Sequence, residues 1–399
     1  MKIELHLIQN FAPSCLNRDD TNQPKDCEFG GVRRARISSQ CIKRAIRKHP
    51  VFGQYLQERL AQRSRWSKDR LREIIRRQDA EPDALVVPVG SFLNMLVSAA
   101  EERTADENAE ATPSPRGRRR GAPEYEHCEA LSWLSDDEMR LIVAWVSEHS
   151  EEVAAAKGKD TKRKVVQAFL GAHPHLPFTP DIALFGRMMA NAVGMNVDAT
   201  SQVAHAISTH RVDMDMDFYT AVDDLNPESE TGAGMMGVTG FNSACFYRYA
   251  LVDRGELLDG KHLKGDQALA DEVTRGFLLA SVYAIPTGKQ NSMAAQNLPS
   301  FGMFVVRSSG APCSLVNAFA EPVRTILGKD EDLIGRSIEA LTGYWARMQR
   351  VYGSDGVLAT PLFHDGREDR LGDLASSDKG SVQDAVAATM EAVRAAKGG

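Results

Sequence analysis

The 399-residue sequence lacks the features that mark membrane and secreted proteins. It contains no run of roughly 18 to 20 apolar residues, the length that spans a bilayer. Its first residues, MKIELHLIQN, lack the basic region and the continuous apolar region of a signal peptide. Its six cysteines form no C-x-x-C pair, so neither a zinc site nor a disulfide framework is indicated. We therefore expect a cytoplasmic protein with reduced thiols and no membrane contact.

Common catalytic and nucleotide-binding motifs are also missing: the sequence has no G-x-x-x-x-G-K-[ST] or H-E-x-x-H, and no G-x-G-x-x-G or G-x-S-x-G in a suitable context. No carboxylate is placed by sequence to orient His205 or His210 as a base. A Pro-rich connector explains His173, His175 and Asp181 better than a metal site does. The loop with Asp213, Asp215 and Asp217 lacks the Gly and the closing Glu of a calcium-binding loop. We expect no cofactor, no metal site and no enzymatic activity.

Charge, in contrast, is unevenly distributed. Hydrophobic residues make up 43% and charged residues 26%, as in an ordinary globular protein, and the net charge is −6. Residues 31–48 nevertheless carry seven cations and no acid: Arg33, Arg34, Arg36, Lys43, Arg44, Arg47 and Lys48. Such segregation indicates one region that binds a polyanion on an otherwise acidic protein.

The basic segment has the pattern of a loop that leads into a helix. Residues 39–49 place Ile42, Ala45, Ile46 and His49 on one helical face and the cations on the other. Ser38 and Ser39 supply hydroxyls and free N–H groups at the helix start, which suit a phosphate. The sequence therefore predicts a phosphate-binding helix supported by an apolar face.

Around this helix the chain predicts a β-α-β-β-α-β core with two interruptions. Residues 50–180 have helical spacing and form one insertion, within which 101–126 lacks large aliphatic residues and predicts a mobile loop carrying Arg116, Arg118, Arg119 and Arg120. The remaining elements are a half-buried strand over 3–8, a loop over 10–31, strands over 181–190, 239–252 and 300–306, and helices over 268–284 and 333–352.

Several motifs resemble the Cascade backbone subunit of type I-E CRISPR systems, the CasC type of the RAMP superfamily. They extend over nearly the whole chain and are weakest over 50–175 and after 355. The matching segments are PSCLNRDD at 13–20, PKD at 24–26, FGGVRRARISSQ at 29–40, KRAIRK at 43–48, DIALFGRM at 181–188, AHAISTH at 204–210, TAVDD at 220–224, FYRYA at 246–250 and GKQ at 288–290.

The resemblance implies an α+β fold with three parts. These are an RNA-recognition-motif (ferredoxin-like) palm, a large helical fingers insertion and a β-hairpin thumb. On this plan the palm comprises 1–49, 181–193 as a strand, and 239–365; the fingers comprise 50–180, the thumb 194–238, and a polar, helix-prone tail 366–399.

The function implied is that of a non-catalytic subunit that binds CRISPR RNA. Copies oligomerise along the guide, hold its phosphates and kink it, so that short segments pair with target DNA. The implied partners are CRISPR RNA, the target DNA strand, other copies of the chain, and the large subunit, small subunit, 5′-end-capping subunit and CRISPR RNA processing endonuclease of the complex.

The resemblance also assigns residues to roles. Met188 matches an apolar wedge, which can unstack bases of any sequence because it reads no hydrogen-bond pattern. His205 and Thr209 accompany it in the wedge and thumb. A basic cluster matches the family's DNA-holding strip only in part, so its residues are candidate DNA contacts with a solvated helix as the alternative: Lys157, Lys159, Lys162, Arg163 and Lys164. The expected RNA-binding residues are Lys25, Arg33, Arg34, Arg36, Ser38, Gln40, Lys43, Arg44, Arg47 and Lys289.

Two enzymatic alternatives remain. Backbone subunits of type III effectors cut RNA with an aspartate in the loop after the first strand, where this chain has Asp19, Asp20 and Asp26, and such a carboxylate could orient a metal-bound water. The favoured interpretation is that these acids pair with Arg18, Lys25 or Arg33 and order the loop. The other alternative, a CRISPR RNA processing nuclease that uses His6, lacks a companion base.

Overall fold

The computed structural model describes residues 1–56, 59–97, 131–221, 235–324 and 332–396, which fall into two compact units. Unit 1 comprises Met1–Glu58 and Ser201–Gly399, and unit 2 comprises Arg59–Thr200. The loop predicted over 101–126, with its arginines, lies outside the described residues. Among the described residues, no helix combines the length and apolar character that crossing a bilayer needs.

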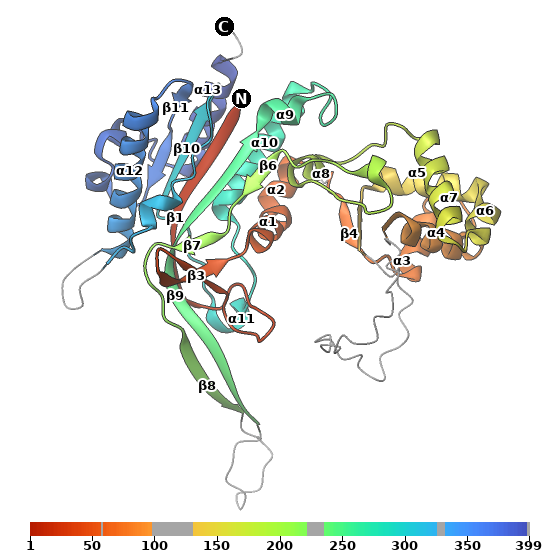
Figure 1. The fold of residues 1–399 in the computed structure, drawn as a ribbon, viewed down its shortest axis with the longest axis horizontal. Coiled ribbons are helices and arrows are strands. Elements are labelled where there is room, and N and C mark those ends of the chain that lie inside the picture. The colour runs from red at the N-terminus through yellow and green to blue at the C-terminus, as the bar shows by residue number, and fades with distance from the viewer. Residues whose placement is uncertain (57–58, 98–130, 222–234, 325–331, 397–399) are drawn as a thin grey trace, which may run out of the picture. The chain divides into compact units, whose positions relative to one another are not determined.

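Unit 1 is built on a sheet whose central strand is the first in the chain. β1 (Lys2–Ser14) pairs antiparallel with β9 (Met235–Asp253) on one side and β10 (Phe301–Arg307) on the other. The strand order is β11-β10-β1-β9-β7-β3-β2, and the additional strands are β6 on β9, β8 on β9 and β12 on β10 (Figure 1). The shorter strands are β2 (Asp26–Phe29), β3 (Val32–Ile37), β6 (Ser201–Val203), β7 (Ala206–Ser208), β11 (Val357–Ala359) and β12 (Leu362–His364).

Helices cover both faces of this sheet. Ile42 and Ile46 of α1 (Ser39–Lys48) and Ser281 of α10 (Gln267–Tyr283) lie over Leu5 and Leu7 of β1. On the opposite face, α12 (Leu333–Tyr352) packs against Ile8, Tyr247 and Met303 through Ile338, Leu341 and Trp345. The strand expected over 3–8 is confirmed as part of β1, but it is buried on both faces and not half-buried, since Glu4 and His6 are also buried.

Several elements of unit 1 confirm the sequence predictions. α12 spans the residues predicted for it, and α1, α10, β9 and β10 agree with prediction to within a few residues. The loop expected over 10–31 is shorter than predicted, because β1 continues to Ser14 and β2 occupies part of the segment. Short helical elements complete the unit: α2 (Pro50–Tyr55), α9 (Arg254–Leu258), α11 (Gln290–Met293), η2 (Val316–Phe319), η3 (Glu368–Arg370) and η4 (Gly372–Ser377).

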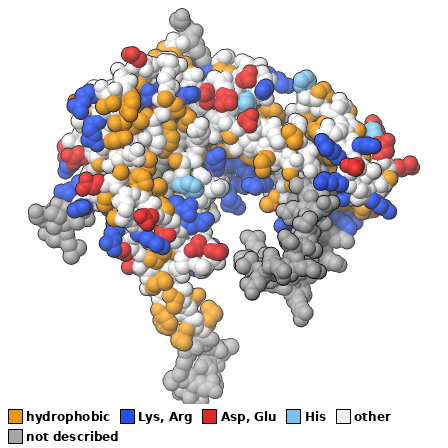
Figure 2. Space-filling view, in the orientation of Figure 1, with side chains coloured by type: hydrophobic (Ala, Val, Ile, Leu, Met, Phe, Trp, Pro, Cys, Tyr) orange, Lys and Arg blue, Asp and Glu red, His pale blue; other side chains and the backbone are white. Residues whose placement is uncertain are grey.

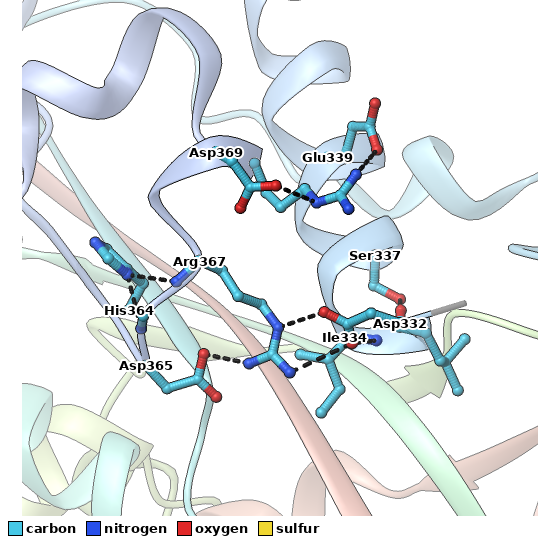
Figure 3. Close-up of polar contacts among 11 residues, drawn as sticks. Asp332, Ile334, Ser337, Glu339, His364, Asp365, Arg367 and Asp369 are labelled. Carbon is cyan, nitrogen blue, oxygen red and sulfur yellow. Dashed lines mark hydrogen bonds and ion pairs between the residues drawn. The ribbon is translucent and has the colours of Figure 1, made fainter. Parts of the chain in front are cut away.

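The C-terminal segment packs onto the sheet. α13 (Val382–Ala395) buries Val386, Met390 and Val393 and contacts β10 and α10. Between β12 and η3, Arg367 lies between Asp332 at the start of α12 and Asp365, with its Nε 2.6 Å from Asp332 Oδ2 (Figure 3). The polar residues of this segment thus fix it to α12.

A two-stranded hairpin extends from the sheet. β8 (Asp215–Ala221) pairs with the first part of β9, so that Phe218 lies opposite Val238 and Thr220 opposite Met236. One face of this ribbon is apolar and exposed, at 61% for both Met216 and Phe218, 67% for Met236 and 55% for Val238 (Figure 2, orange). The opposite face carries Asp215, Asp217 and Tyr219. Within the residues 194–238 predicted as a thumb, β6 and β7 join the main sheet.

The described part of unit 2 is mostly helical, as predicted, and includes a two-stranded ribbon of β4 (Gln62–Ser64) and β5 (Ser132–Leu134). Its core centres on Phe92, Trp145 and Phe169, whose ring centroids lie 5.1–5.5 Å apart. Its helices are α3 (Lys68–Arg76), α4 (Pro82–Val97), α5 (Asp136–Glu148), α6 (Ser150–Ala155), α7 (Lys159–Ala172), α8 (Pro180–Phe185) and η1 (Val193–Met195).

The strand expected over 181–190, and with it the palm strand 181–193, is wrong. Pro180 at the first position starts the helix α8, and Gly186 ends it with φ 73°. The run Asp181–Leu184 is buried in unit 2. A short apolar run fits a buried helix as well as a buried strand, and here the terminal signals decide.

Candidate nucleic-acid interface

The start of α1 lies where three segments of unit 1 meet. Ser38 caps the helix by accepting a hydrogen bond from Cys41 N–H, and its own N–H donates to Asn17 Oδ1 at 2.8 Å. Ser39 N–H donates to His205 Nδ1 at 3.2 Å. The loop after β1, the end of β3 and the segment before β7 are thereby held at one helix terminus.

Two cations of the preceding segments are fixed beside this terminus. The backbone of Lys25 bonds to Asn17 O, and the Arg36 N–H donates to Lys25 O, both at 2.9 Å. Arg36 also donates from Nε to Asp26 O. Both side chains are half-buried. Burial has the largest effect in lowering the pKa of His205, and the nearby charges of Arg36 and Lys25 lower it further.

The helix itself has the two faces predicted. Ile42 and Ile46 are buried, Gln40, Arg44 and Lys48 are exposed, and Lys43 and Arg47 are half-buried. Burial lowers the pKa of Lys43. The apolar face fixes the helix on the sheet, so that cations on the other face are presented on a rigid element.

Lys289 reaches the same region from the turn before α11. Gly288 lies so close to the loop after β1 that a Cβ there would be 2.3 Å from Leu16 O. Lys289 has φ 52°, a left-handed conformation that is costly for a non-glycine residue. The Gln290 amide stabilises the turn by donating to Pro286 O and Ala295 O.

We call this set the α1 basic surface. Lysine and arginine side chains gather in this part of the face shown in Figure 2, above the apolar hairpin. Its members are Lys25, Arg36, Ser38, Gln40, Lys43, Arg44, Arg47, His205 and Lys289.

Two predicted contact residues are corrected by burial. Arg34 is 0% exposed, and its guanidinium donates to Phe29 O, Ser208 O and Phe319 O, so it joins segments of the fold and cannot reach a phosphate. Thr209 is also fully buried, and its Oγ1 lies 2.9 Å from Ser337 Oγ, which excludes a surface role in the thumb. Arg33 is exposed, but it is paired with Asp26.

In unit 2, Met188 is 85% exposed on a rigidly held loop. The preceding Arg187 is buried, donates to Met195 O and Trp133 O, and pairs with Glu138 at 2.8 Å. Glu138 in turn forms a capping box with Ser135 at the start of α5.

The candidate DNA-binding cations in α7 and just before it are exposed: Lys157, Lys159, Lys162, Arg163 and Lys164.

Several of the enzymatic and metal candidates make other contacts. Asp19 accepts from Thr21 and from Gln23 N–H, and His6 is fully buried with its Nδ1 2.9 Å from the Tyr247 hydroxyl. Asp213 pairs with Arg211. In the described part of the chain, no three His, Cys, Asp or Glu side chains are placed to hold a metal ion.

Two features of the site were not predicted from the sequence. Asn17 belongs to the PSCLNRDD motif, but its role as the acceptor for Ser38 N–H depends on a contact between distant segments. The apolar hairpin face had a signal, since Met216 and Phe218 alternate with acids in a polar stretch, as the residues on one face of a strand do.

Comparisons with known proteins agree with this architecture. The family model described as CT1975-like protein matches residues 3–388. A chain of a solved structure titled "CRISPR RNA-guided surveillance complex, pre-nicking" superposes with a TM-score of 0.74 at 27% identity, covering 98% of this chain and 100% of that one. A chain of a second, titled "CRISPR RNA-guided surveillance complex", has a TM-score of 0.58 at 22% identity and the same coverages, and so shows the fold alone. No curated protein sequence matches.

Proposed function

Since the chain belongs to the CT1975-like protein family, we propose that it is the CRISPR RNA-binding backbone subunit of a type I-E Cascade complex, the CasC type, without catalytic activity of its own. Its likeness to a subunit of a CRISPR RNA-guided surveillance complex supports a Cascade-type role. The observation that carries the proposal is the α1 basic surface, where cations of the loop after β1, of β3 and of the turn before α11 accompany those of one helix fixed on the sheet.

This surface suits a guide RNA of any sequence. Lysine and arginine contacts to phosphate fix the position of a strand and carry no base information. A protein that uses many different guides needs that property, because base pairing between guide and target supplies the specificity.

The other parts of the chain support an assembly along the RNA. Unit 1 would form the RNA-recognition-type palm, with β1, β7, β9 and β10 as neighbouring strands and α1 and α10 as its helices. The β8–β9 hairpin would be the thumb, whose apolar face contacts the next copy. Met188 would be the wedge that displaces a base, and the cations at α7 would contact target DNA.

Binding of labelled RNAs of unrelated sequence tests the proposal. The double variant Lys43→Glu/Arg44→Glu should weaken binding of every RNA alike and reduce the dependence of log Kd on log salt, by a slope of about 0.7 for each lost phosphate contact. Lys261→Glu, which reverses an exposed lysine outside the α1 basic surface, is the matched control. Equal affinity of the double variant and the wild type would reject the assignment.

A further inference from the structure

His205 has one ring nitrogen fixed by the protein. The residue is exposed between β6 and β7, and its Nδ1 lies 3.2 Å from Ser39 N, which can only donate. An Nδ1 that accepts a hydrogen bond carries no proton, so the neutral ring carries its proton on Nε2. The backbone of α1 therefore selects the tautomer in which Nε2 is a donor.

The surroundings of His205 favour this neutral form. Burial has the largest effect, and the nearby charges Arg36 of β3 and Lys25 of the loop after β1 add to it; all three lower the pKa of His205 below its usual value. The group of α1 that contacts the His205 ring is the Ser39 N–H, which is a donor and therefore disfavours a proton on His205 Nδ1. At neutral pH the ring is thus an uncharged donor among cations.

We propose that His205 donates a hydrogen bond from Nε2–H to an oxygen of the bound RNA backbone, as an uncharged contact on the α1 basic surface. The inference rests on the proposed function, because it names a further residue of the same surface. Lys25 and Arg36, which flank His205, would attract the phosphates, and the fixed tautomer directs a single N–H at a backbone oxygen. Such a contact differs from that of a lysine because it releases no counterion and leaves the salt dependence unchanged.

Three variants separate this role from a structural one. His205→Asn keeps an acceptor near the position of Nδ1 for Ser39 N–H but has no group near Nε2. His205→Gln places an amide donor near the position of Nε2. His205→Ala removes both. At pH 8 we expect His205→Ala and His205→Asn to weaken RNA binding about three- to tenfold, the effect of one neutral hydrogen bond, and His205→Gln to recover much of the loss.

The salt titration is the second readout. The slope of log Kd against log salt should stay at the wild-type value in His205→Ala, whereas Lys43→Ala should reduce it by about 0.7. Recovery by His205→Asn, or a reduced slope in His205→Ala, would overturn the inference, since the side chain would then act through Ser39 or as a charge. Full affinity of all three variants would also overturn it.

A 2′-deoxy oligonucleotide of the same sequence identifies the acceptor. If the affinity loss in His205→Ala persists, the acceptor is a phosphate oxygen, and if it disappears, the acceptor is a ribose hydroxyl; both results support the donor role. Wild-type protein that binds no RNA would instead reject the proposed function, so the two failures are distinguishable.

Discussion

The Asp26 carboxylate is held by the guanidinium of Arg33, with Oδ2 2.6 Å from Nη2 and 2.7 Å from Nε. The two residues lie on β2 and β3, which form a short hairpin. This ion pair agrees with the favoured interpretation of the sequence, in which the acids of this loop pair with nearby cations and order the loop. It gives the carboxylate a role in ordering the loop and partly neutralises Arg33.

We therefore expect Asp26 to have no part in cutting RNA. Assembled complex incubated with complementary RNA and Mg²⁺ should leave the RNA intact, and Asp26→Ala should change only the stability of the β2–β3 hairpin. Gel analysis of end-labelled RNA provides the measurement. Regularly spaced cuts that disappear in Asp26→Ala would support the nuclease alternative instead.

Arg34 should behave as a structural residue, in contrast to its neighbour Arg36. Arg34→Met removes the donor for three carbonyl groups in the interior, so we expect the free energy of unfolding to fall by about 3 kcal/mol or more. Arg36→Met should reduce RNA affinity and the salt slope with a smaller effect on unfolding. Urea denaturation together with RNA titration distinguishes the two, and a stable Arg34→Met protein with weak RNA binding would contradict the account.

Stability should depend on pH through His6. Burial, with a smaller effect from Arg307, lowers the pKa of His6 to about 3, whereas an unfolded histidine titrates near 6.5. Between these values the unfolded chain holds a proton that the folded chain does not. Stability should therefore fall as the pH is lowered from 6.5 towards 3, by up to about 1.4 kcal/mol per pH unit from this residue.

The variant His6→Phe should lack this contribution. The difference in free energy of unfolding between wild type and His6→Phe should be constant above pH 7 and should shift in favour of the variant as the pH falls. Urea unfolding at several pH values measures it. A difference in free energy of unfolding that stays constant down to pH 4 would show that His6 takes up its proton in the folded protein as readily as in the unfolded chain.

The apolar face of the β8–β9 hairpin should matter for assembly more than for RNA binding by one copy. Phe218→Asp/Met236→Asp should prevent the formation of multimers on a long RNA, because it places charges on a surface that would be buried between copies. Binding to an RNA too short for two copies should be unchanged. Asp217→Asn, on the opposite face, is the matched control, and multimers of normal length from the double variant would count against this use of the hairpin.

Sequence patterns predicted the elements that have one buried face and clear ends. α1 and α12 were found because their apolar residues recur at helical spacing, and in the structure each begins after a side-chain cap, Ser38 and Asp332. α8 was mistaken for a strand because its short apolar run lacks a period. Such runs need their terminal signals to be interpreted.

Which of the predicted cations belong to the site depends on tertiary contacts. Arg33, Arg34 and Arg36 are equivalent in the sequence, but the structure pairs the first with an acid, buries the second and leaves the third half-exposed beside His205. Burial of Arg34 depends on Ser208 and Phe319, which are distant in sequence. Local sequence carries no information on such partners.

The most direct test of the central claim is the size and nucleic-acid content of the protein purified after co-expression with a CRISPR RNA. We predict a large assembly that contains the RNA and has a high ratio of absorbance at 260 nm to that at 280 nm. The variant Lys43→Glu/Arg44→Glu, expressed in the same way, should yield protein with little RNA. A wild-type protein that elutes as a monomer free of nucleic acid would contradict the account.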